Sequence, residues 1–406
     1  MYKNIVILIL TLILIGGCSF LPYSKNIKQI YIQKLSVSQN PISDDCFFDE
    51  GGPYVGITNF DRFFLLDKIS GKIVWKQAGK SNFIGRLSPT GKTVALASFD
   101  QDRQRGEVSV FDETGKTLWN KPIDIPEEVN FSDDGQIIAI KSGIETLSDI
   151  SLYSLKGSFL TDSFSMHKNY DLFLSIPWFI SSGDLILYEV DNHEHLQCIR
   201  MKKQKLWGIL KTFDTKKSSF HFDFGPVFSN KNPDLFFFHL YDVKNAIALL
   251  LAFDLNGNLQ WEKTISLRSD DNIFQIPFSI SADQTNNYLI MNDWINNSLI
   301  LLDVKNGKEI WRHPMSNEVQ GNVELSSSGK WFILFLNEAT QANNNNDLAN
   351  ANQANNLFIY SIKGQIIYQD KLGKNIVQAQ FSQDEKSLYV LDEDTFYAYD
   401  ISGILK

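Results

Sequence analysis

Leu301-Leu-Asp-Val-Lys-Asn-Gly-Lys-Glu-Ile-Trp311 is a clear copy of a pattern that recurs along this chain. In each copy an apolar stretch ends in Asp, a turn with Gly follows, and a second stretch ends in an aromatic residue. Further copies are Phe64-Leu-Leu-Asp-Lys-Ile-Ser-Gly-Lys-Ile-Val-Trp75, Val110-Phe-Asp-Glu-Thr-Gly-Lys-Thr-Leu-Trp119 and Ala252-Phe-Asp-Leu-Asn-Gly-Asn-Leu-Gln-Trp261, with weaker ones at 153–157, 204–207, 359–368 and 399–403. Gly in such a turn adopts positive φ without steric cost, so each copy predicts a β-hairpin.

A second turn motif lies between these copies. It reads Leu87-Ser-Pro-Thr-Gly91, Phe131-Ser-Asp-Asp-Gly135, Leu325-Ser-Ser-Ser-Gly329 and Phe381-Ser-Gln-Asp384, with looser versions at 180–183, 228–232 and 280–283. Ser, Asp and Gly are typical of tight turns, and most of these turns precede an apolar strand. Each unit is therefore predicted to contain four strands joined by two tight turns and one variable loop.

The copies recur about every 47 residues between Gly71 and Gly403, which is the period of a four-stranded propeller blade. No stretch has a sustained helical period. We therefore predict an all-β fold, a β-propeller of four-stranded antiparallel blades, most simply with eight blades and with seven as the alternative. The segment Gln29–Leu35 is expected to complete the last blade and close the ring, which leaves no open sheet edge.

The aromatic residue that ends each copy is expected to pack between neighbouring blades, because large rings bury much apolar surface. These structural aromatics are Trp75, Trp119, Trp207, Trp261, Trp311 and Tyr368.

The copies resemble the quinoprotein-type (PQQ-like) propeller repeat, which has the same Asp-x-x-x-Gly-Lys-x-x-Trp pattern, and the Ser-x-Asp-Gly turns resemble those of WD-repeat-like propellers. This resemblance covers about residues 45–406 and implies a fold rather than a function, because propellers host unrelated activities. The adjacent cysteine pair of the larger quinoprotein dehydrogenases has no counterpart, so no cofactor is predicted.

The N-terminus reads as an export signal: Lys3, an apolar run over 5–15, then Gly16-Gly-Cys18. The run is too short to span a bilayer as a helix. Ile15-Gly-Gly-Cys18 resembles a bacterial lipobox, which implies cleavage before Cys18 and attachment of acyl chains such as palmitate, enough for a stable membrane anchor. We predict a signal peptide over 1–17, a lipidated tether over 18–28 and the propeller over 29–406.

The resemblance to lipoproteins also implies an extracytoplasmic location. Ser19 is not the Asp that retains diderm lipoproteins at the inner membrane, which indicates the outer membrane in a diderm host and the cell surface otherwise. The net charge of −9 lacks the basic footprint of a nucleic-acid-binding protein. Cys46 and Cys198 remain, and the sequence leaves open whether they pair.

Binding is expected where loops vary, because variable loops on a rigid scaffold usually carry recognition. The loops between second and third strands vary most here, and they hold the candidate partner-binding residues Asp100, Arg103, Arg105, His193, His195 and Trp294. Residues 337–356 are Asn-rich and are predicted to be a disordered loop. No metal site is predicted, because His193 and His195 read most simply as part of a solvated loop.

No catalytic motif for nucleophilic, metal-dependent or nucleotide chemistry is present, so no catalytic residue and no enzyme activity are predicted. The hypothesis is a lipid-anchored scaffold that binds a protein partner through the variable-loop face. In anchor, repeat and blade number the chain resembles the propeller lipoprotein of the outer-membrane β-barrel assembly machinery, which implies a role in envelope protein assembly. Quinone binding, another enzyme activity in the central funnel, and capture of a surface polysaccharide are the alternatives.

Overall fold

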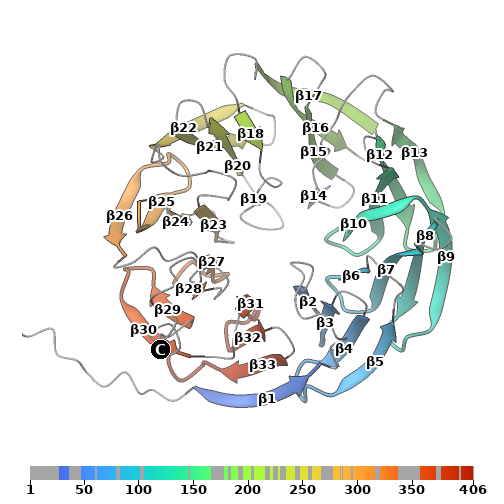
Figure 1. The fold of residues 1–406 in the computed structure, drawn as a ribbon, viewed down its shortest axis with the longest axis horizontal. Helices are drawn as coiled ribbons and strands as arrows, with labels where there is room; N and C mark the ends of the chain where they lie inside the picture. The colour runs from blue at the N-terminus through green and yellow to red at the C-terminus, as the bar shows by residue number, and fades with distance from the viewer. Residues whose placement is uncertain are drawn as a thin grey trace, which may run out of the picture.

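A computed structural model of the chain shows a ring of antiparallel sheets around a central axis (Figure 1). The structure describes residues 27–35, 47–59, 62–78, 83–100, 105–144, 147–165, 178–181, 184–190, 195–202, 205–214, 220–222, 227–228, 235–242, 247–254, 258–266, 278–283, 285, 287–293, 296–315, 321–336, 357–371, 376–392 and 395–405. These residues form eight sheets, seven of four strands and one of five, and contain no helix. The predicted all-β propeller is confirmed, and its eight sheets match the eight copies of the turn.

The sheets follow one another along the chain, and we number them as blades. Blade one contains β2 (Phe47–Gly51), β3 (Tyr54–Asn59), β4 (Arg62–Asp67) and β5 (Ile73–Ala78); blade two contains β6 (Ile84–Leu87), β7 (Thr93–Asp100), β8 (Arg105–Asp112) and β9 (Thr117–Ile123); blade three contains β10 (Ile125–Phe131), β11 (Ile137–Ile144), β12 (Leu147–Ser154) and β13 (Phe159–Ser165); blade four contains β14 (Trp178–Ser181), β15 (Asp184–Val190), β16 (His195–Lys202) and β17 (Lys205–Asp214).

The second half of the chain repeats this order. Blade five contains β18 (Phe220–Phe222), β19 (Val227–Phe228), β20 (Leu235–Asp242), β21 (Ile247–Asp254) and β22 (Leu259–Ser266); blade six contains β23 (Phe278–Ala282), β24 (Tyr288–Asp293), β25 (Ser298–Asp303) and β26 (Glu309–Pro314); blade seven contains β27 (Gly321–Leu325), β28 (Trp331–Leu336), β29 (Leu357–Ser361) and β30 (Ile366–Asp370); blade eight contains β31 (Ile376–Phe381), β32 (Ser387–Asp392), β33 (Thr395–Asp400) and β1 (Lys28–Lys34). In blade five, β18 and β19 both pair with β20, so the inner strand of this blade is divided in two.

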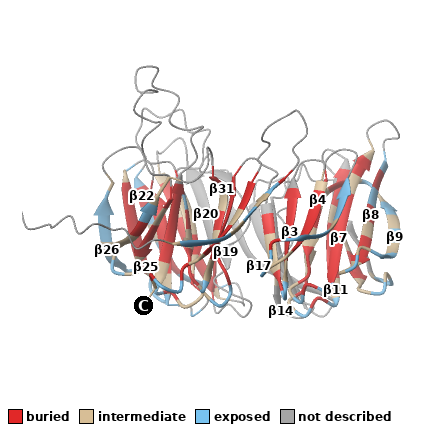
Figure 2. Cartoon of the chain, turned by 90° about the horizontal axis from the view of Figure 1, so that it is seen from below, coloured by how far each residue is buried: buried red, intermediate tan, exposed pale blue. Residues whose placement is uncertain are grey.

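The first strand of each blade lies nearest the axis and the fourth lies on the rim (Figure 1). Because the strands of a blade are antiparallel, both tight turns of that blade lie at the same end of the ring, which we call the turn face. Hydrogen bonds join the two turns of one blade, as from Lys68 N to Pro53 O at 2.9 Å and from Val304 N to Asn287 O at 3.0 Å. The second-to-third-strand loops belong to the opposite end, the loop face, as the sequence predicted (Figure 2).

Aromatic residues of the repeat pack against the turn of the next blade. Trp119 Nε1 donates a hydrogen bond to Leu155 O at 2.9 Å, and Trp261 Nε1 donates to Val304 O at 2.7 Å. The turn glycine lies against the same ring: a Cβ on Gly157 would come within 2.9 Å of Trp119. Trp311 and Tyr368 also lie in clusters shared with the following blade, whereas Trp207 lies on β17 with a side chain outside the described residues.

The ring closes through β1, which pairs antiparallel with β33 as predicted. Tyr31 on β1 takes the place of the repeat aromatic in blade eight, because a Cβ on Gly71 of blade one would overlap its ring. The two ends of the chain therefore form one blade, and the contact between blades eight and one follows the same rule as the others.

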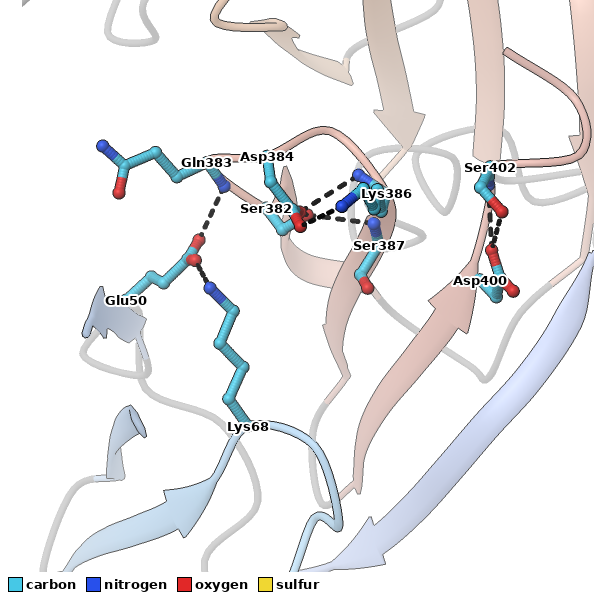
Figure 3. Close-up of polar contacts among 9 residues, drawn as sticks. All are labelled: Glu50, Lys68, Ser382, Gln383, Asp384, Lys386, Ser387, Asp400 and Ser402. Carbon is cyan, nitrogen blue, oxygen red and sulfur yellow. Dashed lines mark hydrogen bonds and ion pairs between the residues drawn. The ribbon is translucent and has the colours of Figure 1, made fainter. Parts of the chain in front are cut away.

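Polar contacts on the turn face strengthen this closure (Figure 3). The Glu50 carboxylate pairs with Lys68 of its own blade and accepts a hydrogen bond from Gln383 N of blade eight at 3.1 Å. Within the blade-eight turn, Asp384 accepts hydrogen bonds from Ser382 Oγ at 2.7 Å and from Lys386 N at 3.2 Å. One carboxylate thus joins blade one to a residue of blade eight that is 333 positions away in sequence.

Buried residues concentrate on the second and third strands of the blades (Figure 2). Each cluster joins the facing sides of adjacent blades, as Leu250 of blade five and Leu289 of blade six do. The described part of the chain has no helix long and apolar enough to cross a membrane.

Candidate functional site

Two of the predicted partner-binding residues meet at the loop face of blade two. Asp100 is the last residue of β7, Arg105 is the first of β8, and the two lie directly opposite one another in the ladder. Arg103, His193 and Trp294 lie outside the described residues, as do Cys18, Cys46 and the segment 337–356. His195 begins β16 and Cys198 lies within it, but their side chains are not described, so the pairing of the cysteines stays a prediction.

Asp100 and Arg105 line a pocket of about 460 Å³ between blades one and two. The pocket reaches from the end of β5 across the face that blade two turns toward blade one. Its lining comprises Gln77, Ala78, Phe83, Leu96, Ser98, Asp100, Arg105, Gly106, Glu107, Ser109, Phe111, Asn120, Lys121 and Pro122. A volume of this size lies in the usual range for ligand sites.

Blade two carries a small side chain at one position of its third strand, and the pocket lies beside it. Three residues before the residue that begins the turn after the third strand, blades one, five and six carry the large buried side chains Phe64, Leu251 and Ile300, whereas blade three carries Ser151. Blade two carries Ser109 there, half-buried and opposite Leu96 of β7 and Asn120 of β9. A small polar side chain leaves the space between the blades unfilled, because close packing needs side chains of matching volume.

The floor of the pocket is apolar and partly aromatic. Phe83, Leu96 and Phe111 are buried. The Trp75 ring lies between Phe63 and Phe111, at centroid distances of 5.4 and 5.5 Å. The apolar floor therefore rests on an aromatic cluster shared by blades one and two.

The rim of the pocket is charged. Glu107 Oε1 accepts a hydrogen bond from Ser109 Oγ at 2.9 Å and lies 3.5 Å from Asn120 Nδ2. The Lys121 ammonium lies over the Tyr153 ring of blade three, 5.3 Å from its centroid. The charged residues of the lining are thus Asp100, Glu107, Arg105 and Lys121.

A second polar cluster lies near the axis, on the first strands of blades one to three. Arg86 Nη2 on β6 pairs with Glu128 Oε1 on β10 at 2.7 Å, and Asp49 Oδ2 on β2 accepts a hydrogen bond from Leu87 N at 3.2 Å. Burial raises the pKa of both carboxyls, although Arg86 opposes the shift. Burial disfavours the charged guanidinium, but these two carboxylates hold the pKa of Arg86 above its usual value.

Glu324 on β27 belongs to the same inner layer. Burial raises its pKa to about 7, and Ser281 Oγ, 3.5 Å away, opposes this weakly. Sequence reasoning missed the four charged groups near the axis. The signal that could have found them is a charged residue within a predicted inner strand, because most other residues of such a strand are apolar.

The polar side chains near the axis connect the inner strands of neighbouring blades, which is a structural role. Leu325 N donates to Ser281 Oγ at 2.9 Å and Phe48 N donates to Gln378 Oε1 at 2.8 Å, so side chains of one inner strand hold the backbone of the next. Among the residues that the structure describes, no three His, Cys, Asp or Glu side chains are placed to hold a metal ion.

Comparisons with known proteins agree with this fold. The family model of the outer membrane protein assembly factor BamB matches residues 35–142, which include blades one and two and the pocket. A BamB of Nitrosomonas eutropha is 30% identical over 98 residues, which are 24% of this chain and 22% of that protein. The matched region thus spans under a quarter of that relative.

Three solved structures cover nearly the whole chain. The crystal structure of BamB from Moraxella catarrhalis has a TM-score of 0.58 at 10% identity, covering 92% of this chain and 98% of that one. The Dos1 propeller has 0.63 at 11%, covering 93% and 95%, and the dihydro-heme d1 dehydrogenase NirN in complex with DHE has 0.59 at 12%, covering 92% and 74%. BamB is an assembly factor and NirN is a dehydrogenase, so the shared fold does not distinguish a scaffold from an enzyme. The chain is a β-propeller in fold, and its repeat is similar to that of PQQ-like propellers.

Proposed function

We propose that this chain is a lipid-anchored, extracytoplasmic scaffold, not an enzyme, that binds a protein partner through its loop face during the assembly of outer membrane proteins. The observation that carries the proposal is the pocket between blades one and two. It opens where β5 and β7 end and β8 begins, and it lies within the part of the chain that matches the BamB family model.

The two faces of the ring differ in how their polar groups are used. On the turn face, backbone hydrogen bonds join turn to turn, both within a blade and between blades, as from Gly52 N to Pro89 O at 3.1 Å. On the loop face, the pocket presents charged side chains over an aromatic floor. Aromatic residues and arginine are enriched at protein–protein interfaces and polar groups form their rim, which supports the loop face as the binding face.

The lipid anchor is supported by the lipobox-like sequence before Cys18. We expect Cys18→Ser in the full chain to move the protein from the membrane fraction to the soluble fraction of its host, because two or more acyl chains provide the membrane affinity. Immunoblotting of the fractions measures this. Equal membrane retention of both forms would contradict lipid anchoring.

Partner binding is tested with a photo-crosslinking residue placed in the full chain in its host. At Gln77, beside the pocket, we expect a crosslink to a component of the outer-membrane assembly machinery, identified by mass spectrometry. Lys116, exposed on the turn face of blade two, is the matched control. Crosslinks at Lys116 but none at Gln77 would overturn the loop-face proposal.

A functional readout accompanies the crosslink. Asp100→Ala with Arg105→Ala should lower the amount of folded outer-membrane β-barrel proteins, measured by their heat-dependent gel mobility. Glu113→Ala on the turn face of the same blade should leave that amount unchanged.

A further inference from the structure

We infer that the pocket between blades one and two is a receptor for an arginine side chain of an extended partner segment. This inference rests on the proposed function, since it names the chemistry by which the loop face would recognise its partner. The charge of Glu107, the apolar floor of the pocket and the shape of the pocket support it.

The lining of the pocket contains two carboxylates, Asp100 and Glu107, and two cations, Arg105 and Lys121. Asp100 faces Arg105 across the ladder, and the ammonium of Lys121 lies 5.3 Å from the centroid of the Tyr153 ring. Glu107 is contacted by neutral donors, Ser109 Oγ and Asn120 Nδ2. Within the described ranges no Lys or Arg pairs with Glu107. The Glu107 carboxylate can therefore pair with one positive charge from a partner.

The floor beneath this carboxylate suits a guanidinium. Phe83 and Phe111 line the pocket with apolar ring surface, along which the methylene stem of a long basic side chain can lie while its head stays at the polar rim. A guanidinium is planar, weakly hydrated and able to stack on aromatic rings, whereas an ammonium is more strongly hydrated. A carboxylate also accepts two parallel hydrogen bonds from a guanidinium, which favours arginine over lysine.

The shape of the pocket indicates a polypeptide as the source of the arginine. A volume of about 460 Å³ exceeds what one side chain fills, and the lining continues to the exposed Gln77 and Ala78 at the end of β5. A segment of a few residues can lie across this opening with its arginine inserted toward Glu107.

The experiment uses purified full chain and the peptide acetyl-Gly-Gly-Arg-Gly-Gly-amide, titrated by NMR or calorimetry. We expect binding by this peptide, about tenfold or more weaker binding when citrulline replaces arginine, and a similar loss with Glu107→Gln, because a charge-assisted bond is then removed. Glu113→Gln, which neutralises a turn-face carboxylate of the same blade, should leave the affinity unchanged.

A filling variant separates the pocket from the charge. Ser109→Leu restores the large side chain of the repeat, so it should abolish binding while the melting temperature is kept or raised. Equal binding of the arginine and citrulline peptides, unchanged affinity of Glu107→Gln, or no binding at millimolar concentrations would overturn the inference. The crosslink at Gln77 distinguishes failure of the arginine site from failure of the scaffold function. If the crosslink persists in Glu107→Gln and Ser109→Leu, the scaffold function stands and only the arginine site is lost.

Discussion

At the scale of single residues, two tryptophans of the repeat occupy the same place but differ in hydrogen bonding. Trp261 Nε1 donates to Val304 O at 2.7 Å, whereas Trp75 Nε1 is buried with no hydrogen-bond partner. Removing one member of a buried pair leaves the other unsatisfied, whereas removing an unpaired group does not. Trp261→Phe should therefore lower the free energy of unfolding by about 1–2 kcal/mol more than Trp75→Phe. Urea denaturation of both variants measures the difference, and equal losses would show that the hydrogen bond contributes nothing.

Glu324 gives a prediction about pH at the same scale. Its pKa is about 7 in the folded protein, above the usual value of 4.5. Between these values the native state binds more protons than the unfolded state, so the Glu324 contribution to stability falls as pH rises through this window. Glu324→Gln removes this loss and should raise stability relative to the wild type by about 3 kcal/mol at pH 8.

The variant and the wild type should converge at pH 4, where both side chains are neutral in the folded protein. Comparing them cancels the titration of Asp49 and Glu128, whose pKa values are also raised. Denaturation at several pH values measures the difference. A constant gap between the two proteins would contradict the assignment to Glu324.

At the scale of elements, the turn between the third and fourth strands of several blades is fixed by a glycine against an aromatic ring. Gly115 has φ +84°, and a Cβ there would lie 3.0 Å from Trp75. Gly115→Ala should lower the free energy of unfolding by about 1–2 kcal/mol from the left-handed backbone alone, with a further loss from the displaced ring.

Gly403 in the last turn is the matched control. Its φ is not in the left-handed region, and a Cβ would meet nothing within 4 Å. Gly403→Ala should therefore be neutral in thermal denaturation. If both variants melted alike, ring contact and positive φ would not explain the repeated Gly.

At the scale of the whole molecule, closure depends on nine residues near the N-terminus. Residues 27–35 contain β1, which covers the edge of β33 and places Tyr31 against Gly71. Deleting residues 1–35 should lower the melting temperature and expose an aggregation-prone edge, because an unpaired strand edge is a template for association.

Deleting only residues 1–26 leaves β1 in place and should not change the melting temperature. Hydrogen exchange in β33 distinguishes the two truncations, with faster exchange expected only when β1 is missing. If exchange in β33 were the same in both, the ring would be closed by other contacts, such as that between Glu50 and Gln383.

The turn chemistry of this chain could be predicted because it is local. Asp and Gly occur within a few residues of one another, and their conformational preferences act wherever the segment is placed. The repeated Asp, Gly and aromatic residues therefore predicted the strands, the fold class and the packing role of Trp119 and Trp261. Asp100 and Arg105 could be placed at the loop face for the same reason, since they flank a variable loop between two strands.

Contacts between distant segments were decided only by the tertiary structure. Arg86 and Glu128 are 42 residues apart, and nothing near either one indicates that they pair. The pocket over Ser109 likewise needs the facing side of blade one, and Tyr31 acquires its role only when the two ends of the chain meet. The sequence by itself thus determined the structure of each blade, because the turns of a blade depend on residues close together in sequence. The tertiary structure decided the site and the closure of the ring, because both depend on contacts between residues far apart in sequence.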